Sequence, residues 1–309
     1  MSDAPMCSVA TPTTAASLPP ASSVTHVHLM ACINTELMQA AAPVGRVVRI
    51  LDAGCGNGHL LAYLHACMSR LHPEWTIELH GFDVVDHGVQ QSGFIARTVE
   101  ELSARHPDIE WSQRIRAIGT REAWPFADET FDLVVSNQVL EHVRDPSTFF
   151  GEMKRVLVPG GTEVHLFPLE HYVLEGHLHL PWVHRIQSHD LRVAYITLLS
   201  RLGLGKYPEH RRNSGVALAD FAVRHADYME FWTHYLTESE VLAMAKHAGL
   251  RAAFRYTSGF YAQKLRSMSG RRPTLLYRAR DRGLWDSVTV KALRYVSSVT
   301  LTCRKENSY

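Results

Sequence analysis

The sequence predicts an α/β fold in which a mainly parallel sheet is covered by helices. Apolar, strand-like runs alternate with amphipathic helical segments from residue 47 to residue 167. A turn with closely spaced glycines joins the first of these strands to the next helix, within residues 47–59. In an open parallel sheet such a turn lies at the carboxyl edge, where ligands bind.

The first half of the chain supplies five expected strands and the helices between them. Each strand is rich in apolar residues and is bounded by turn residues. The strands are expected at 47–52, 76–83, 114–118, 130–137 and 162–167. The helices are expected at 29–38, from about residue 60, at 94–105 and at 146–157, where Pro159, Gly160 and Gly161 end the last one.

The alternation breaks after residue 167. Residues 168–235 contain no clear strand but many histidine, arginine and aromatic residues, and we expect a largely helical lid there. The regular pattern returns at Thr237, where T-E-S-E is a capping box that opens a helix ending at Gly249. Two more strands are expected, at 251–257 and 299–304.

These boundaries divide the chain into four expected parts. The start of the chain is rich in alanine, serine, threonine and proline, a composition typical of disordered tails. The parts are a disordered tail at 1–25, a cofactor-binding core at 26–167, a substrate or lid insertion at 168–235, and the rest of the core at 236–309, which contains a basic insertion at 265–295.

The glycine turn reads D-A-G-C-G-N-G from Asp52 to Gly58. A dinucleotide fingerprint requires G-x-G-x-x-G, but its last position is His59 here, which disfavours a nicotinamide oxidoreductase. The turn instead resembles motif I of the class I S-adenosylmethionine (SAM) methyltransferases. The resemblance covers 47–167, and more weakly 237–304. It implies a Rossmann-like sheet of seven strands with helices on both faces.

The resemblance also implies a SAM site, with S-adenosylhomocysteine as the product. In the family, motif I glycines let the backbone approach the methionyl group, and the motif I acid helps to hold its amino-acid end. An acid after the second strand accepts hydrogen bonds from both ribose hydroxyls. The matching positions are Asp52, Gly54, Gly56, Asn57, Gly58 and Asp83, with Thr120 replacing the usual aspartate of the adenine loop and Asn137 beside the sulfonium.

The segment S-N-Q-V-L-E-H-V follows the fourth strand, at 136–143. Ubiquinone-type and small-RNA 2′-O-methyltransferases carry E-x-x-E-H here and use it to bind a divalent metal. In this chain Gln138 replaces the first glutamate, which removes an anionic ligand and weakens a site for a hard cation. Metal binding by Glu141 and His142 therefore stays an open alternative to a site without metal.

Five histidines follow the fifth strand, between residues 168 and 189. Methyl transfer from SAM is an in-line displacement, so most of the catalysis is alignment of the nucleophile. A hydroxyl nucleophile also benefits from a base near neutral pKa, which histidine supplies. Our candidates are His171 and His177, followed by His142. Exposed lid residues, structural histidines, or a metal site at Glu175, His177 and His179 are the alternatives.

The charge is unevenly distributed although the net charge is only +1. Residues 251–305 contain thirteen lysines and arginines against two aspartates. This run is either a solvated face or a surface for an anionic glycan, lipid or membrane. No nucleic-acid module is recognisable, and no apolar run or leader points to a membrane span or secretion. We expect a cytoplasmic protein, with peripheral membrane contact and a homodimer left open.

The five cysteines are scattered through the chain without a C-x-x-C pair. Their spacing predicts neither disulfides nor a zinc site. Taken together, the sequence predicts methyl transfer from SAM to a small molecule or glycan, most simply to a hydroxyl. A SAM-fold protein that binds without catalysis or serves as a partner subunit, and a metal-assisted O-methyltransferase using Glu141 and His142, are the alternatives.

Overall fold

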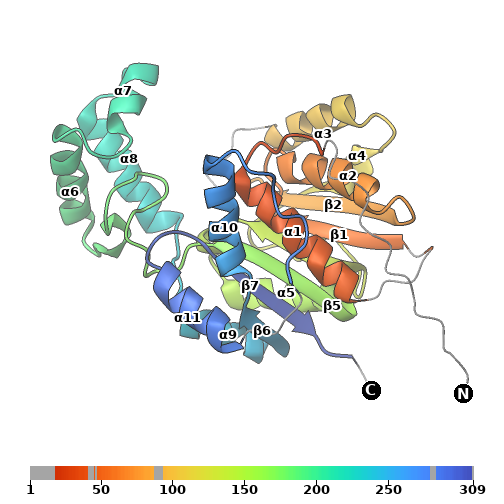
Figure 1. Ribbon diagram of the computed structural model, residues 1–309. Helices are drawn as coiled ribbons and strands as arrows, with labels where there is room; N and C mark the ends of the chain where they lie inside the picture. Colours follow the sequence, from red (N-terminus) through yellow and green to blue (C-terminus); the bar gives the residue numbers. More distant parts are fainter. Residues whose placement is uncertain (1–17, 41–44, 46, 87–92, 279–282, 308–309) are drawn as a thin grey trace, which may run out of the picture.

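The computed structural model describes residues 18–40, 45, 47–86, 93–278 and 283–307. A single seven-stranded sheet forms its centre, with helices on both faces and a helical block to one side (Figure 1). The strand order is β3-β2-β1-β4-β5-β7-β6. The first five strands run parallel, and β7 is antiparallel to both of its neighbours. This sheet confirms the predicted fold class.

The strands lie where the sequence predicts them, apart from their ends. The central strands are buried on both faces, which explains their nearly continuous apolar runs. The strands are β1 (Val47–Ala53), β2 (Thr76–Val84), β3 (Ile115–Ile118), β4 (Phe131–Asn137), β5 (Leu157–Phe167), β6 (Leu250–Phe254) and β7 (Val299–Lys305).

Two apolar clusters hold the helices onto the sheet, one on each face. The first face is covered by α1 (Val24–Gln39), α2 (His59–Leu71), α3 (Phe94–Arg105), α4 (Trp111–Arg114) and α10 (Thr257–Met268). The second is covered by α5 (Pro146–Val156), α9 (Glu238–His247) and α11 (Gly283–Leu293). The capping box of α9 is formed by Thr237 and Glu240. None of the described helices is long and apolar enough to cross a membrane.

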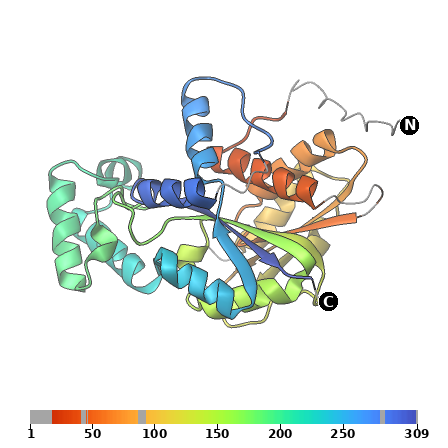
Figure 2. The same ribbon diagram turned by 60° about the horizontal axis from the view of Figure 1, so that its bottom comes forward.

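The segment after β5 forms a separate helical block. It contains α6 (His189–Arg201), α7 (Tyr207–Ser214) and α8 (Leu218–Phe231), preceded by the short turn η2 (Val183–Arg185). Figures 1 and 2 both show these helices beside the sheet and not on its faces. The block has its own small core, which includes Leu178, Val183, Ile196, Phe221 and Ala226. This cluster is separate from the two that hold the helices onto the sheet.

The fifth strand begins earlier than its sequence predicts. Phe131 of β4 pairs with Leu157, whereas Leu133 pairs with Thr162, so the register shifts between them. Helix α5 ends at Val156, within one residue of its predicted end, but the predicted strand start at residue 162 is five residues late. A bulge inserts extra residues into one strand without ending it, and here it absorbs the proline and both glycines.

The beginning and end of the core also differ from expectation. Helix α1 begins at Val24, and the side chain of Ser23 accepts a hydrogen bond from the Thr25 amide. Leu18 packs against the first-face core. The predicted disordered tail is therefore wrong for residues 18–25, while residues 1–17 lie outside the described part of the chain. The strand predicted at 251–257 ends at Phe254, because α10 begins three residues later.

Candidate functional site

The glycine turn after β1 has a shape that only glycine fits. Gly54 has a φ of +79°, and a Cβ placed there would lie 2.6 Å from Cγ2 of Val139. Gly58 has a φ of +72°, and its Cβ would lie 2.7 Å from Cδ1 of Leu102. Gly56 also has a positive φ, of +52°, but nothing lies within 4 Å of its Cβ position. The turn is thus packed on the protein side and open at Gly56, where a ligand can approach the backbone.

Two buried carboxyl groups lie beside this turn. The Asp83 carboxylate accepts the amide hydrogens of Gly56 at 2.6 Å and of Val84 at 2.8 Å. Burial raises the pKa of Asp83, and these two hydrogen bonds act against that rise. Oδ1 of Asp52 is buried and has no hydrogen-bond partner among the described residues. Burial, followed by the charge of Asp83, raises the pKa of Asp52 to about 8.

Asn137 ends β4 at the same edge of the sheet. Its amide donates to Oγ1 of Thr25 at 3.3 Å, and its own Oδ1 is buried without a partner among the described residues. The start of α1 therefore reaches the site, which the sequence does not reveal because residues 18–25 resemble a disordered tail. Asn57 is exposed in the glycine turn.

The loop after β3 is held by acids that the sequence analysis did not single out. Both the amide and the hydroxyl of Thr120 donate to Asp86, at 2.8 and 3.1 Å. The amide of Gly119 donates to Glu122 at 2.9 Å. Asp86 is the second acid of the G-F-D-V-V-D run that contains Asp83, so this signal was present. The Thr120 hydroxyl is thereby oriented toward Asp86.

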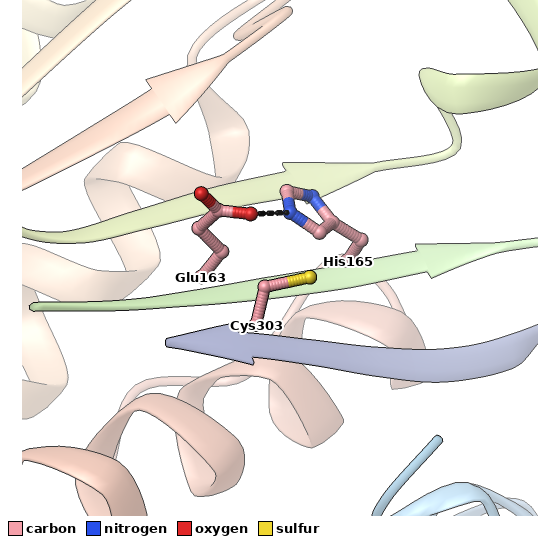
Figure 3. Close-up of side chains that lie close together, drawn as sticks. All are labelled: Glu163, His165 and Cys303. Atoms are coloured by element: carbon pink, nitrogen blue, oxygen red, sulfur yellow. Dashed lines mark hydrogen bonds and ion pairs between the residues drawn. The ribbon is translucent and has the colours of Figure 1, made fainter. Parts of the chain in front are cut away.

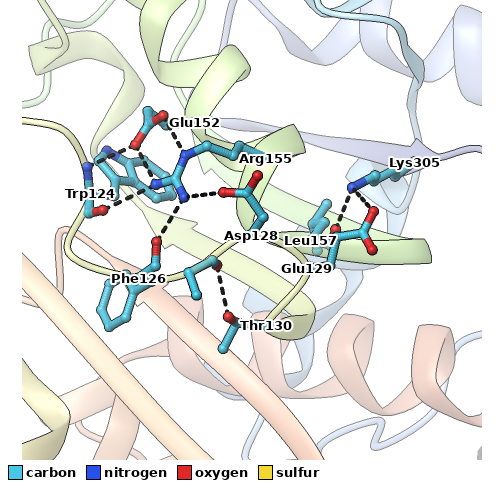
Figure 4. Close-up of polar contacts among 10 residues, drawn as sticks. Trp124, Phe126, Asp128, Glu129, Thr130, Glu152, Arg155, Leu157 and Lys305 are labelled. Carbon is cyan, nitrogen blue, oxygen red and sulfur yellow. Dashed lines mark hydrogen bonds and ion pairs between the residues drawn. The ribbon is translucent and has the colours of Figure 1, made fainter.

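Arg155 of α5 fixes the far end of the same loop (Figure 4). Its guanidinium donates to the carbonyl oxygens of Phe126 at 2.7 Å and Trp124 at 3.1 Å. Glu152 accepts from both the Arg155 guanidinium and the Trp124 amide. The hydrogen bond with Glu152 raises the pKa of Arg155. Trp124 packs against Phe82 with 4.5 Å between ring centroids, so it is a core residue of this loop.

On the other side of the edge, His142 and His177 come together. His142 lies in the short turn η1 (Leu140–His142) directly after β4, and His177 lies in the insertion. Their ring centroids are 5.2 Å apart, and both rings pack against Tyr228, at 6.0 and 5.0 Å. Nδ1 of His142 hydrogen-bonds to the carbonyl oxygen of Trp232 at 2.8 Å. Nδ1 of His177 lies 2.6 Å from Oε1 of Glu175.

Glu175 is fully buried, yet it is satisfied on all sides. Besides His177, its carboxylate accepts from the hydroxyls of Tyr172 at 3.1 Å and Tyr235 at 2.8 Å, and from the amide of Leu178 at 2.7 Å. Burial alone would raise the pKa of Glu175, but the hydrogen bond and charge of His177 outweigh it and lower the pKa to about 2. The carboxylate of Glu175 thus lies buried directly behind His177.

Glu141 is a buried carboxyl with the opposite behaviour. Its Oε2 has no hydrogen-bond partner among the described residues. Burial raises its pKa to about 8, and the charge of Glu175 acts in the same direction. Gln138 does not help it, because its side-chain amide donates to Ser298 and to the carbonyl oxygen of Leu166. In the described part of the chain, Glu141 and His142 do not belong to a preformed group of three metal-ligating side chains.

The other histidines of the insertion lie apart from this pair. The ring of His171 packs against Tyr295, at 6.0 Å between centroids. His184 is stacked on Tyr172 at 4.7 Å, and His189 hydrogen-bonds to Asp227 at 2.8 Å, which joins α6 to α8. Of the three predicted catalytic histidines, the structure thus brings together His142 and His177 and places His171 elsewhere.

The basic run does not form one uniform surface. Arg255, Arg294 and Lys305 form ion pairs with glutamates of other elements. Arg266, Arg271 and Arg272 instead line a cavity of about 520 Å³ beside the start of α1. Residues 279–282, which contain two more arginines, lie outside the described residues.

Comparisons with known proteins find methyltransferases. Residues 51–164 match the model of a family described as a methyltransferase domain. An uncharacterized methyltransferase of Mycobacterium leprae is 28% identical over 216 residues, which is 65% of this chain and 69% of that protein. A ubiquinone biosynthesis O-methyltransferase of Cereibacter sphaeroides is 32% identical over 114 residues, which is 37% of this chain and 38% of that protein. A solved SAM-dependent methyltransferase from Mesorhizobium loti has a TM-score of 0.45 at 16% identity, covering 87% of this chain and 95% of that one.

Proposed function

This chain belongs to the class I SAM-dependent methyltransferases, and from that premise we propose that it methylates a hydroxyl of a small molecule or glycan, with His177 as general base. The observation that supports this choice most directly is the 2.6 Å contact between His177 and the buried Glu175. It lies at the carboxyl edge of the sheet, on the far side of β4 from the glycine turn. The glycine-turn side of this edge would then bind the methyl donor, and the His177 side would bind the methyl acceptor.

The chain's own residues fit the cofactor. SAM supplies a methyl group on a sulfonium, which makes that methyl electrophilic. Asp52 has a buried oxygen without a partner, which suits the ammonium of the methionyl group. Asp83 is fixed by two backbone amides and keeps lone pairs for the ribose hydroxyls. Gly56 leaves open space where the cofactor would lie against the backbone.

The acceptor's proton would move to His177. Because Nδ1 of His177 is hydrogen-bonded to Glu175, Nε2 is the ring nitrogen that can accept a proton. The carboxylate holds the ring in this tautomer and stabilises the imidazolium that forms. His142 and Tyr228 pack around the ring and would form an aromatic wall for the acceptor. His171 ranks behind His177, because it packs against Tyr295 and lacks such an anion.

A second candidate is metal-assisted O-methylation at Glu141 and His142. The buried, unpartnered Oε2 of Glu141 favours it, since a divalent cation would compensate an ionised carboxylate there. Treatment with EDTA separates the two mechanisms. We expect turnover to survive chelation, whereas loss of turnover that Mg²⁺ restores would establish the metal-assisted reaction.

The proposal is tested by a methyl-transfer screen with labelled SAM against sugars, lipids and phenols. With the acceptor identified, His177→Ala should lower kcat by about 100-fold or more while leaving the Kd for SAM unchanged. His189→Ala, a histidine of the same insertion that binds Asp227, is the matched control and should keep full turnover. Equal turnover of His177→Ala and wild type would refute the base. SAM binding without transfer to any acceptor would favour a non-catalytic protein.

A further inference from the structure

A second cluster of ligand-type side chains lies inside the sheet, away from the methyl-transfer edge. Glu163 and His165 point to the same face of β5, two residues apart, and Cys303 of β7 is paired directly opposite Glu163. Their ligand atoms all lie within 4.8 Å of one another (Figure 3). All three side chains are buried. Cys303 is far from Glu163 and His165 in sequence, so cysteine spacing does not reveal the cluster.

The carboxyl group of Glu163 is only partly satisfied by its neighbours. Oε2 of Glu163 lies 3.3 Å from Nε2 of His165, and Oε1 has no hydrogen-bond partner among the described residues. No lysine or arginine in the described part of the chain forms an ion pair with Glu163. A buried carboxylate is costly unless it is paired with a charge or coordinates a metal. The neighbouring histidine compensates it only if it is protonated.

The histidine is oriented as a metal ligand would be. The hydroxyl of Ser136 on β4 hydrogen-bonds to Nδ1 of His165 at 2.8 Å, which directs Nε2 toward Glu163. A hydrogen bond on the other ring nitrogen is the usual way in which a ligating histidine is held. Phe149 and Phe150 of α5 pack near the ring, with centroids 6.4 and 6.3 Å away, and close the cluster from that side.

We propose that Glu163, His165 and Cys303 bind a structural divalent transition metal of the zinc type. One nitrogen, one sulfur and carboxylate oxygens favour a borderline metal over Mg²⁺ or Ca²⁺, which prefer oxygen alone. The second Glu163 oxygen can supply the fourth donor of a closed structural site. The metal would join β7 to β5. It would enter while the chain folds, because the finished cluster is buried on all sides.

Metal binding would require the Cys303 thiol to lose its proton to solvent, since the thiolate is the ligand. Burial, followed by the charge of Glu163, raises the pKa of Cys303 well above its usual range. The metal-free cluster therefore holds a protonated thiol beside a carboxyl group. A bound dication would replace that proton and compensate Glu163 at the same time.

The test is to unfold the full chain, refold it with Co²⁺, remove free metal by dialysis, and measure bound cobalt and the thiolate-to-cobalt charge-transfer band. We expect about one cobalt per chain and a clear band. Cys303→Ser should lose the band, and the cobalt bound per chain should fall at least tenfold. Cys67→Ser, the same change at another buried cysteine, should keep both.

The result that would overturn the proposal is a refolded wild-type chain that holds no cobalt or zinc after dialysis, or a Cys303→Ser chain that keeps the band. Glu163→Gln is the second variant, used if Cys303→Ser does not fold, and it should also lose the metal. An unchanged Tm of the wild type with and without zinc would equally contradict the structural role, leaving a histidine–glutamate pair without metal.

Discussion

Two pairs of buried carboxyl groups stand at the carboxyl edge of the sheet, and they are satisfied in different ways. In each pair one member has an unpartnered oxygen and a pKa of about 8: Asp52 on the glycine-turn side and Glu141 on the insertion side. The other member is hydrogen-bonded. Asp83 takes its donors from backbone amides, whereas Glu175 takes them mainly from side chains of the insertion. The side proposed to bind the methyl donor, called the donor side below, is thus built by local backbone. The side proposed to bind the methyl acceptor, called the acceptor side, is built by side chains that are distant in sequence.

Because of this difference, the two sides tolerate different amino-acid substitutions. The amide that Gly56 donates to Asp83 stays in place only while the backbone keeps its conformation, so the pocket proposed for SAM depends on the shape of the glycine turn. The anion at Glu175 depends on the identity of Tyr172, His177 and Tyr235, which can change with the insertion. An insertion of this kind can therefore select a new acceptor while the cofactor pocket stays the same.

The largest expected effect is loss of cofactor binding when the donor-side anion is removed. Asp83→Ala should raise the Kd for SAM by about 1,000-fold, since losing two hydrogen bonds to a charged acceptor costs about 4 kcal/mol. Isothermal titration measures the Kd, and circular dichroism checks that the variant stays folded. Acceptor affinity should not change. An unchanged Kd for SAM would refute the ribose role of Asp83.

The corresponding change on the acceptor side should act on turnover. Glu175→Gln keeps the shape but removes the charge behind His177, so kcat should fall by about 100-fold, with the Kd for SAM within about twofold of wild type. Equal turnover of Glu175→Gln and wild type would show that the carboxylate does not assist His177.

A matched control for this variant is Glu230→Gln. Glu230 belongs to the same insertion, but it is partly exposed and pairs with Arg192. It should keep the kcat of the wild type. If both glutamate variants lose turnover equally, the effect comes from the packing of the insertion and not from His177.

The same contrast explains what the sequence could predict. The donor side is formed by β1, the glycine turn that follows it, and the end of β2. Its glycines and Asp83 therefore form a pattern that can be recognised in the sequence. The acceptor side joins residues from η1, the loop after β5, α8 and the segment before α9. Strand and helix periodicity cannot show that His177 meets His142 and Tyr228, or that its Nδ1 hydrogen-bonds to Glu175. The start of α1 was missed because its composition resembles a tail.

A smaller effect is expected from pH on the donor side. The pKa of Asp52 is raised to about 8, so the group is protonated in the free protein at pH 6 and must ionise to pair with the SAM ammonium. The affinity for SAM should therefore rise by up to about tenfold per pH unit between pH 6 and 7.5, where the ammonium stays charged. Titrations in two buffers should show proton release on binding.

The stability of the free protein should change in the opposite direction. Because the folded state holds a proton on Asp52 that the unfolded chain gives up near its ordinary pKa, the free energy of unfolding should fall as the pH rises toward 8. Asp52→Asn should remove most of the pH dependence of SAM affinity but only part of that of stability, because the buried Glu141, whose pKa is also raised to about 8, remains. A steep affinity profile that persists in this variant would show that another group titrates.

The smallest expected effect concerns the adenine loop, where the donor side itself depends on side chains. Thr120 donates its hydroxyl hydrogen to Asp86, so the oxygen is left to accept and not to donate toward a base. Thr120→Val keeps the size of the side chain and the bond from its own amide to Asp86, and it should raise the Kd for SAM only about two- to fivefold. Asp86→Asn should have an equal or larger effect, because it weakens both contacts that orient the loop. Isothermal titration of the two variants decides the point. A loss near that of Asp83→Ala would mean that this hydroxyl, although tied to Asp86, is a principal cofactor contact, and the donor side would then rely on side chains as the acceptor side does.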